Sequence, residues 1–228
     1  MMVNLGEKSN LDVIHERIPL HGKTVADIGC GSLGFTREIS SHCQQVFAID
    51  PSPEVAEQIR RQDDLGNIEF HHAEAEQIPL ADSSVDGIFF CHSLHHISAQ
   101  LYPRAFAEAQ RVLRARGFLY VIEPTDFPLN EVMSLFHDER QAKADAQTAL
   151  RDLALPQFSQ SEEFTYSSFR KYDSFDHFAK KFINKHCIPG DDSSQTQIQA
   201  AKNLFEQYGA PDYRFKIAKR VMHLSEKT

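Results

Sequence analysis

Short apolar runs alternate with longer amphipathic stretches along the first 124 residues. The apolar runs predict buried strands, and the stretches between them, with apolar residues three or four positions apart, predict helices. The expected strands are 23–28, 45–50, 67–71, 85–91 and 117–123, and the expected helices are 34–42, 53–61 and 100–115. The run 85–91 (VDGIFFC) is almost entirely apolar, which predicts a central strand buried on both faces. Strands joined by helices in this way predict right-handed crossovers and a doubly wound sheet.

The pattern changes after Pro124. A long polar helix is expected over about 130–153, with a break at Pro156 and a weaker strand at 164–169. Phe175, Phe178 and Phe182 fall on one stripe of a further helix. The segment 213–217 (YRFKI) alternates strictly, as a half-exposed antiparallel strand does. We therefore expect an α/β fold with a mostly parallel seven-strand sheet and an antiparallel last strand.

Composition narrows the class of protein. The chain has 228 residues, of which 41% are hydrophobic and 25% charged, which fits one globular domain. No apolar run approaches the length of about 18 residues that a membrane span needs, and the first ten residues do not resemble a signal peptide, so a cytoplasmic protein is expected. The four cysteines, at 30, 43, 91 and 187, lack metal-knuckle spacing, which favours reduced thiols. The net charge of −8 disfavours a nucleic-acid partner.

A glycine-rich turn follows the first of these strands. Gly29, Gly31 and Gly34 lie in VADIGCGSLGFT, where the backbone can approach a ligand closely because no Cβ intervenes. Asp50 ends the next strand, and a carboxylate there typically accepts hydrogen bonds from both ribose hydroxyls. The GxGxxG spacing fits NAD as well as S-adenosylmethionine. Asp27 favours the latter, since it would hold a methionine ammonium and repel a pyrophosphate, although a capping role for Asp27 stays open.

Four ordered segments resemble the class I methyltransferases of the small-molecule type, related to ubiquinone- and biotin-pathway enzymes. The segments are 27–31 (DIGCG), 48–52 (AIDPS), 73–86 (AEAEQIPLADSSVD) and the set 93–97 (SLHHI), 111–113 (RVL) and 117–124 (GFLYVIEP). The resemblance covers roughly Val25 to Pro124 and implies a Rossmann-like methyltransferase fold. It departs from the family at Leu33, which occupies the place of the usual third glycine, and at Ala73 and Glu74, which stand where the family has Gly and Asp.

The resemblance also implies the cofactor and its site. The cofactor would be S-adenosylmethionine, with S-adenosylhomocysteine as product. Asp50 would bind the ribose, Glu74 and the Ala75 amide would lie against the adenine edge, and Cys91 and His92 would offer backbone carbonyls to the methionine end. The full set of expected cofactor-binding residues is Asp27, Gly29, Cys30, Gly31, Asp50, Pro51, Glu74, Ala75, Cys91 and His92.

Methyl transfer chiefly needs alignment and a dry pocket, so the sequence forces no catalytic residue. His95 and His96 are the candidates for a base, because they follow the fourth strand, where the methyl group should lie. We expect no metal site, since no acidic residue or cysteine stands at a ligand interval from these histidines. Tyr166 and Tyr172 are candidates for the acceptor pocket. The basic cluster of Arg214, Lys216, Lys219 and Arg220 is interpreted as a solvated strand face.

We expect a single methyltransferase domain over 1–228, with an N-terminal cap at 1–22, a cofactor-binding core at 23–124, and a substrate cap with sheet completion at 125–228. The acceptor is expected to be a small molecule whose recognition lies in 1–22 and 125–190. Membrane association is not expected, and nothing in the pattern indicates an oligomeric state. The alternatives are an NAD-linked oxidoreductase, from the GxGxxG spacing, an RNA methyltransferase that uses the basic strand, and a non-catalytic cofactor-binding protein.

Overall fold

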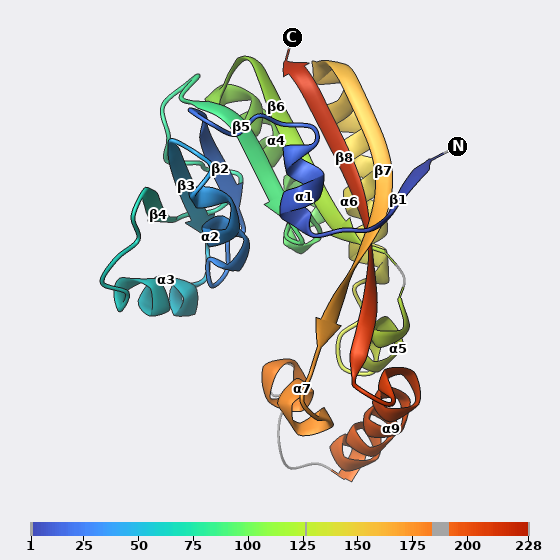
Figure 1. Ribbon diagram of the computed structural model, residues 1–228. Coiled ribbons are helices and arrows are strands. Elements are labelled where there is room, and N and C mark those ends of the chain that lie inside the picture. The colour runs from blue at the N-terminus through green and yellow to red at the C-terminus, as the bar shows by residue number, and fades with distance from the viewer. Residues whose placement is uncertain (1, 126, 184–191, 228) are drawn as a thin grey trace.

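One eight-stranded sheet organises the molecule (Figure 1). The computed structural model describes residues 2–125, 127–183 and 192–227. The strands are β1 (Val3–Glu7), β2 (Thr24–Ile28), β3 (Gln45–Asp50), β4 (Ile68–His72), β5 (Val85–Cys91), β6 (Leu113–Pro124), β7 (Phe158–Lys171) and β8 (Arg214–Lys227). The helices are α1 (Asn10–His15), α2 (Gly34–Ser40), α3 (Pro53–Arg60), α4 (Tyr102–Val112), α5 (Pro128–Ser134), α6 (Arg140–Ala149), α7 (Phe175–Lys181) and α9 (Asp192–Gly209). Short turns of helix are η1 (Leu94–His96), η2 (Ala99–Leu101), η3 (Leu150–Ala154) and η4 (Leu155–Gln157).

The sheet order is β1-β7-β8-β6-β5-β2-β3-β4. Strands β6, β5, β2, β3 and β4 run parallel, whereas β8 is antiparallel to both β6 and β7. The chain builds β2, β3 and β4 in one direction and then returns to build β5 and β6 in the other. The switch point is therefore the gap between the carboxyl ends of β2 and β5, which is where open α/β sheets bind ligands.

The expected α/β class, with a mostly parallel sheet and an antiparallel last strand, is confirmed, and β5 is central as predicted. The sheet nevertheless has one strand more than the expected seven, because β1 pairs in parallel with β7 through Val3 and Phe164. Strand β1 is short and mostly exposed, so it carries no hydrophobic pattern. Strands β7 and β8 are longer than predicted, since they pair with each other along their whole length.

The single helix predicted over about 130–153 is wrong. Helix α5 ends at Ser134 and α6 begins at Arg140. Between them the chain turns so that Asp138 binds Arg140 and Glu139 reaches His95. These polar contacts compete with continuation of the helix, and no periodicity in the sequence encodes them.

Helices cover both faces of the sheet. Helices α1, α2 and α3 pack on one face through Val13, Ile39 and Ile59. Helices α4 and α6 pack on the other face through Phe106 and Ala146. Cys30, Cys43 and Cys91 form no disulfide, and Cys187 lies outside the described residues. Among the described residues no helix combines the length and apolarity needed to cross a membrane.

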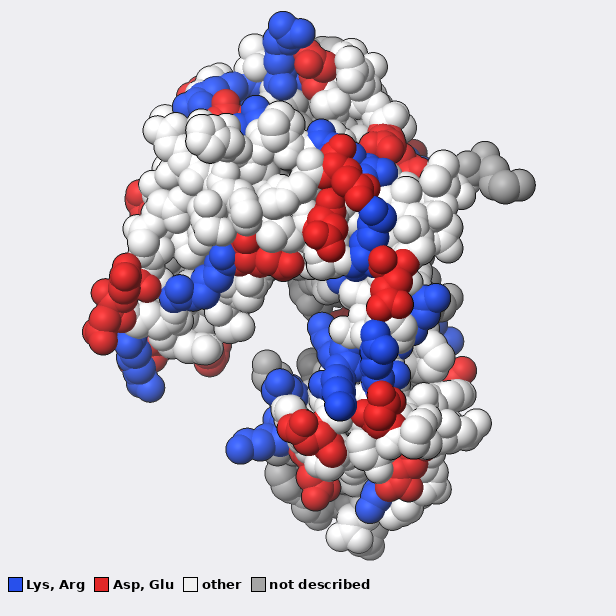
Figure 2. All heavy atoms as spheres, viewed as in Figure 1, with Lys and Arg blue, Asp and Glu red and all other residues white. Residues whose placement is uncertain are grey.

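A third core lies away from the sheet, where β7 and β8 extend beyond it to meet α5, α7 and α9 (Figure 1). We call these helices, with the strand ends that they cover, the helical unit. Phe178 and Phe205 are fully buried there beside Phe215 of β8. Phe175 is buried and Phe182 is half-buried, so the predicted aromatic stripe faces this core. A hollow separates the helical unit from the edge of the sheet that carries α3 (Figure 2).

Candidate functional site

The glycine turn leaves β2 at Ile28 and is built from left-handed backbone. Gly29 has φ +74° and Gly31 has φ +52°. A Cβ on Gly29 would lie 2.4 Å from Cβ of Ser93, so a side chain cannot fit there. The amides of Gly29 and Cys30 both donate to the Ile49 carbonyl, at 2.8 and 3.1 Å, which fastens the turn to β3. These contacts fix the turn beside the switch point of the sheet.

Leu33, the departure from the family pattern, also adopts a left-handed conformation, with φ 67°, directly before α2. Its side chain is fully buried in the core between the sheet and helices α1 to α3. A non-glycine residue in this conformation costs on the order of 1 kcal/mol, and burial of a leucine side chain contributes about 1.5–3 kcal/mol, which offsets it. The loop therefore keeps its shape without the third glycine at this position.

Asp50 ends β3 and is fixed by two backbone amides. Gly31 donates to Oδ2 at 2.9 Å and Ser52 donates to Oδ1 at 2.9 Å. Ser52 also accepts a hydrogen bond from the Val55 amide, so the same short segment begins α3. Each carboxylate oxygen retains capacity for a further donor. Asp50 therefore presents a rigid acceptor pair beside the glycine turn.

Asp27 lies on β2 and is almost completely buried. Thr36, in the first part of α2, donates to Oδ2 at 2.6 Å, whereas Oδ1 has no partner among the described residues. Burial raises the pKa of the Asp27 carboxyl to about 7, and the nearby Asp50 adds to this effect, although the Thr36 hydrogen bond opposes it. A buried acceptor without a donor is costly, so this oxygen is a candidate to accept from a further donor group.

A cavity of about 280 Å³ lies at the carboxyl edge of the sheet. Its lining residues are Ile28, Gly29, Pro51, Glu74, Ala75, Glu76, Phe90, Ser93, His96, Ile97, Ser98 and Leu101. The fold thus brings together four of the residues expected at the cofactor site, namely Gly29, Pro51, Glu74 and Ala75. Asp27, Cys30, Gly31, Asp50, Cys91 and His92 neighbour these lining residues along the chain without being part of the lining.

The sequence analysis assigned no role to several lining residues that follow β5. Ser93 donates to the Ile28 carbonyl at 2.5 Å and so joins β5 to the glycine turn. Ile97, Ser98 and Leu101 belong to the turns η1 and η2 or adjoin them. The available signal was the segment 93–97, which matches the family as a unit.

His92 directly follows β5 with φ 58°, and its amide donates to the Ile122 carbonyl at 2.8 Å. Nε2 of His92 is buried and has no hydrogen-bond partner among the described residues. Burial lowers the pKa of His92 to about 3, and the charge of Lys219 lowers it further, so the ring is neutral at physiological pH.

His95 sits between two carboxylates. Its Nδ1 lies 2.5 Å from Oε2 of Glu123 on β6, and its Nε2 lies 3.6 Å from Oε2 of Glu139 at the start of α6. Burial acts to lower the pKa of His95, but the hydrogen bonds with Glu123 and Glu139 outweigh it and raise the pKa to about 9. A pKa of about 9 favours the imidazolium form of His95 at neutral pH, and this form cannot act as a base.

His96, by contrast, is exposed and lines the cavity, with its ring centroid 4.1 Å from that of His95. Donor atoms of His95, His96 and Glu139 lie within 4.8 Å of one another. Glu139 also forms an ion pair with Lys143 at 2.9 Å. We interpret the group as a charge network that ties η1 and β6 to α6. The sequence could not indicate Glu139, because it is far from both histidines along the chain.

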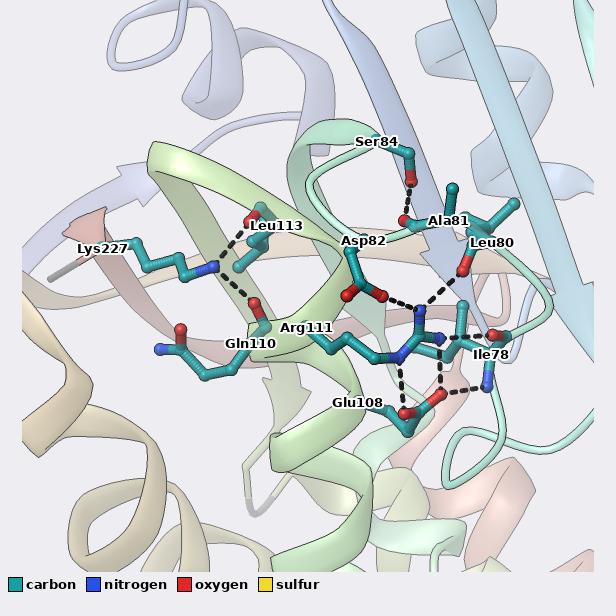
Figure 3. Close-up of polar contacts among 10 residues, drawn as sticks. All are labelled: Ile78, Leu80, Ala81, Asp82, Ser84, Glu108, Gln110, Arg111, Leu113 and Lys227. Atoms are coloured by element: carbon teal, nitrogen blue, oxygen red, sulfur yellow. Dashed lines mark hydrogen bonds and ion pairs between the residues drawn. The ribbon is translucent and has the colours of Figure 1, made fainter.

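An arginine network holds the loop of the third segment (Figure 3). Arg111 of α4 donates to the carbonyls of Ile78 and Leu80, both at 2.8 Å, and binds Asp82 and Glu108 through its remaining N–H groups. Glu108 in turn accepts from the Ile78 amide at 2.9 Å. This loop follows Glu74, Ala75 and Glu76, which line the cavity, so Arg111 fixes the chain next to those residues.

Comparison with known proteins finds a similarity over the part of the chain that carries these features. The sequence profile of the methyltransferase domain family matches residues 26–121. Over these residues the chain is similar to methyltransferase domains. The matched residues include the glycine turn, Asp50, the residues that line the cavity and the Arg111 network.

Two curated relatives resemble part of this chain in sequence. An uncharacterized methyltransferase of Mycobacterium bovis is 31% identical over 105 residues, which is 46% of this chain and 41% of the relative. An O-methyltransferase of Pyrenophora dematioidea is 29% identical over 122 residues, which is 51% of this chain and 45% of the relative. The chain thus spans less than half the length of these relatives. The YcgJ protein of Bacillus subtilis shares the fold, with a TM-score of 0.62 at 16% identity over 96% of this chain and 98% of that one.

Proposed function

We propose that the protein transfers a methyl group from S-adenosylmethionine to a small-molecule acceptor. The observation that carries this proposal is the unpartnered Oδ1 of Asp27, buried beside the glycine turn. An ammonium group would satisfy that oxygen and pair with its charge, whereas a pyrophosphate would be repelled by it. The methyltransferase domain and this carboxylate together favour S-adenosylmethionine over NAD.

The residues around the cavity suit the other parts of the cofactor. In this proposal Asp50 accepts from the ribose hydroxyls through the capacity that Gly31 and Ser52 leave free. Glu74 and the Ala75 amide lie against the adenine, and the carbonyls of Cys91 and His92 face the methionine end. Pro51, Gly29 and Cys30 complete the enclosure. The bound cofactor supplies an electrophilic methyl group on a cationic sulfur, and the chain supplies alignment and exclusion of water.

The acceptor in this proposal is a small molecule. The curated relatives named O-methyltransferases include one from Pyrenophora dematioidea and one from Penicillium expansum. The net charge of −8 disfavours a nucleic-acid acceptor. We take residues 1–228 as one domain, in which 1–22 and 125–228 cover the acceptor. The contact of Asn10 in α1 with Tyr166 and Lys219 supports such a cap.

Calorimetry with S-adenosylmethionine and NAD tests the cofactor. We expect micromolar affinity for S-adenosylmethionine and no heat with NAD. Asp27→Asn keeps the shape of the side chain but removes its charge, so affinity should fall roughly tenfold to a hundredfold. Glu57→Gln, which removes an exposed carboxylate of α3, is the control and should leave affinity unchanged. Binding of NAD without a response to S-adenosylmethionine would contradict the proposal.

Transfer itself is tested by incubating the protein with methyl-labelled cofactor and a metabolite extract. Label in a small-molecule fraction is the expected result. Tight cofactor binding without transfer into any fraction would favour a non-catalytic cofactor-binding protein instead.

A further inference from the structure

Lys219 on β8 is the one Lys or Arg that is buried within the described parts of the chain, with 5% of its surface exposed. Alternation along β8 explains its position, because Phe215, Ile217 and Val221 point inward with it while Arg214 and Lys216 point outward. The interpretation of this cluster as a solvated face is therefore wrong for Lys219. A buried ammonium is costly unless it is paired with an anion.

No carboxylate within the described ranges pairs with Lys219. Its Nζ donates to Oδ1 of Asn10 at 2.6 Å, and the Tyr166 hydroxyl donates to the same oxygen at 2.7 Å. The amide oxygen of Asn10 and the Tyr166 ring, whose centroid lies 5.3 Å from Nζ, are both neutral, so no anion balances the charge. Two N–H groups of the ammonium remain available for a further acceptor. Burial lowers the pKa of Lys219, and Arg170 lowers it further.

A second cation lies on the same face of the β7–β8 ribbon. The register pairs Tyr166 with Lys219, Ser168 with Ile217 and Arg170 with Phe215, so Lys219 and Arg170 project to one side. Arg170 is exposed and forms no ion pair with any described residue. Two cations that lack an anion repel each other, and this arrangement becomes favourable when an anion binds between them.

The pair faces the switch point of the sheet. Cys91, the last residue of β5, lies within 4.0 Å of Asn10 through Sγ and Nδ2. The charges of Lys219 and Arg170 both act on His92, which follows it. Basic side chains also gather where β7 and β8 leave the sheet, on the wall of the hollow opposite α3 (Figure 2). The cations therefore stand beside the place that the proposed function gives to the methionine end of the cofactor.

We propose that Lys219 and Arg170 bind an oxyanion carried by the methyl acceptor, so that the acceptor is an acidic small molecule with a carboxylate or a phosphate. This inference rests on the proposed function. Lys219 supplies a buried, desolvated positive charge. Arg170 supplies a planar guanidinium group that contacts the anion from the solvent-exposed side. Asn10 and Tyr166 hold the ammonium in place from α1 and β7.

Calorimetry on protein saturated with S-adenosylhomocysteine tests this inference. The probes are phenylacetate against phenylacetamide, and phenyl phosphate against phenol, which distinguish the two kinds of anion. At least one acid should bind roughly tenfold or more tightly than its neutral partner, as expected when a charged hydrogen bond is gained. Equal affinity of both acids and their neutral partners would overturn the inference.

Two variants separate recognition from folding. Lys219→Met should abolish the preference for the acid and should leave the free energy of unfolding unchanged or higher, because the costly buried charge is gone. Lys216→Met, on the outward face of the same strand, should keep the preference. If Lys219→Met unfolds the protein, Lys219→Arg keeps the charge and should retain the preference. Loss of the preference in Lys219→Arg or in Lys216→Met would overturn the inference.

A second measurement needs no choice of probe. The metabolite extract is divided on an anion-exchange resin at neutral pH before the labelled-methyl assay. Methyl-accepting activity in the retained fraction supports an acidic acceptor, and activity confined to the unretained fraction overturns it. Failure of the parent protein to bind S-adenosylmethionine would instead remove the proposed function, so the two failures are distinguishable.

Discussion

Asp27 and Asp50 end up in different electrostatic situations although they lie on neighbouring strands. Asp50 accepts hydrogen bonds from the backbone amides of Gly31 and Ser52, one at each carboxylate oxygen. Asp27 accepts a hydrogen bond only from the Thr36 hydroxyl. Its burial raises its pKa to about 7. The Asp27 carboxyl is therefore partly ionised at physiological pH, and a bound cationic ligand should lower its pKa and favour the carboxylate.

At the proposed cofactor site, the pKa of Asp27 predicts an affinity that depends on pH. Below a pKa of about 7 the carboxyl is protonated and cannot pair with an ammonium, and above it the carboxylate can. Binding of S-adenosylhomocysteine, which lacks the sulfonium charge, should be roughly eightfold weaker at pH 6 than at pH 7.5. Calorimetry at a series of pH values measures this. In Asp27→Asn the dependence should vanish, and a slope that persists there would assign it to another group.

At the scale of whole elements, the sequence pattern predicted those strands and helices that depend on contacts between residues close together in the chain. Strands β3 and β5 were predicted with their observed bounds, because each is a compact apolar run between turn residues. Strand β1 and the break before α6 were not predicted, since they depend on Phe164 and His95, which are distant along the chain. For the same reason Glu139 and Asn10 could not be placed near the site from sequence. The inward position of Lys219 could have been predicted, because it continues the alternation that places Phe215 and Ile217 on the inner face.

The link between α4 and the loop after β4 depends on the shape of one guanidinium. Arg111 binds two carbonyls and two carboxylates at once (Figure 3). A lysine cannot reproduce this fork, so Arg111→Lys should lower the free energy of unfolding by about 2–3 kcal/mol. Urea denaturation measures it. Arg114→Lys is the matched control, since Arg114 forms one half-exposed pair with Asp86 and should lose less than about 1 kcal/mol. Equal losses would show that the network adds nothing beyond a surface ion pair.

The whole molecule joins two hydrophobic regions through one pair of strands. The sheet with its covering helices holds the cavity, and the helical unit holds a separate aromatic core around Phe205 (Figure 1). Strands β7 and β8 pair continuously from one region into the other, from Phe158 and Lys227 to Lys171 and Arg214. We therefore expect the two regions to unfold together, which fits the interpretation of residues 1–228 as one domain.

Truncation of the aromatic core tests this coupling. Phe205 is fully buried among Phe178, Phe215 and Tyr172, so Phe205→Ala should lower the free energy of unfolding by about 3–5 kcal/mol. Denaturation followed by both fluorescence and far-UV circular dichroism should still show one transition. Affinity for S-adenosylmethionine should change less than about twofold, because no residue of the cavity lies in the helical unit. Lys202→Ala, on the exposed side of α9, is the control. Two separate unfolding transitions, of which the cofactor shifts only the second to higher denaturant concentration, would instead divide the chain into two independently folding domains.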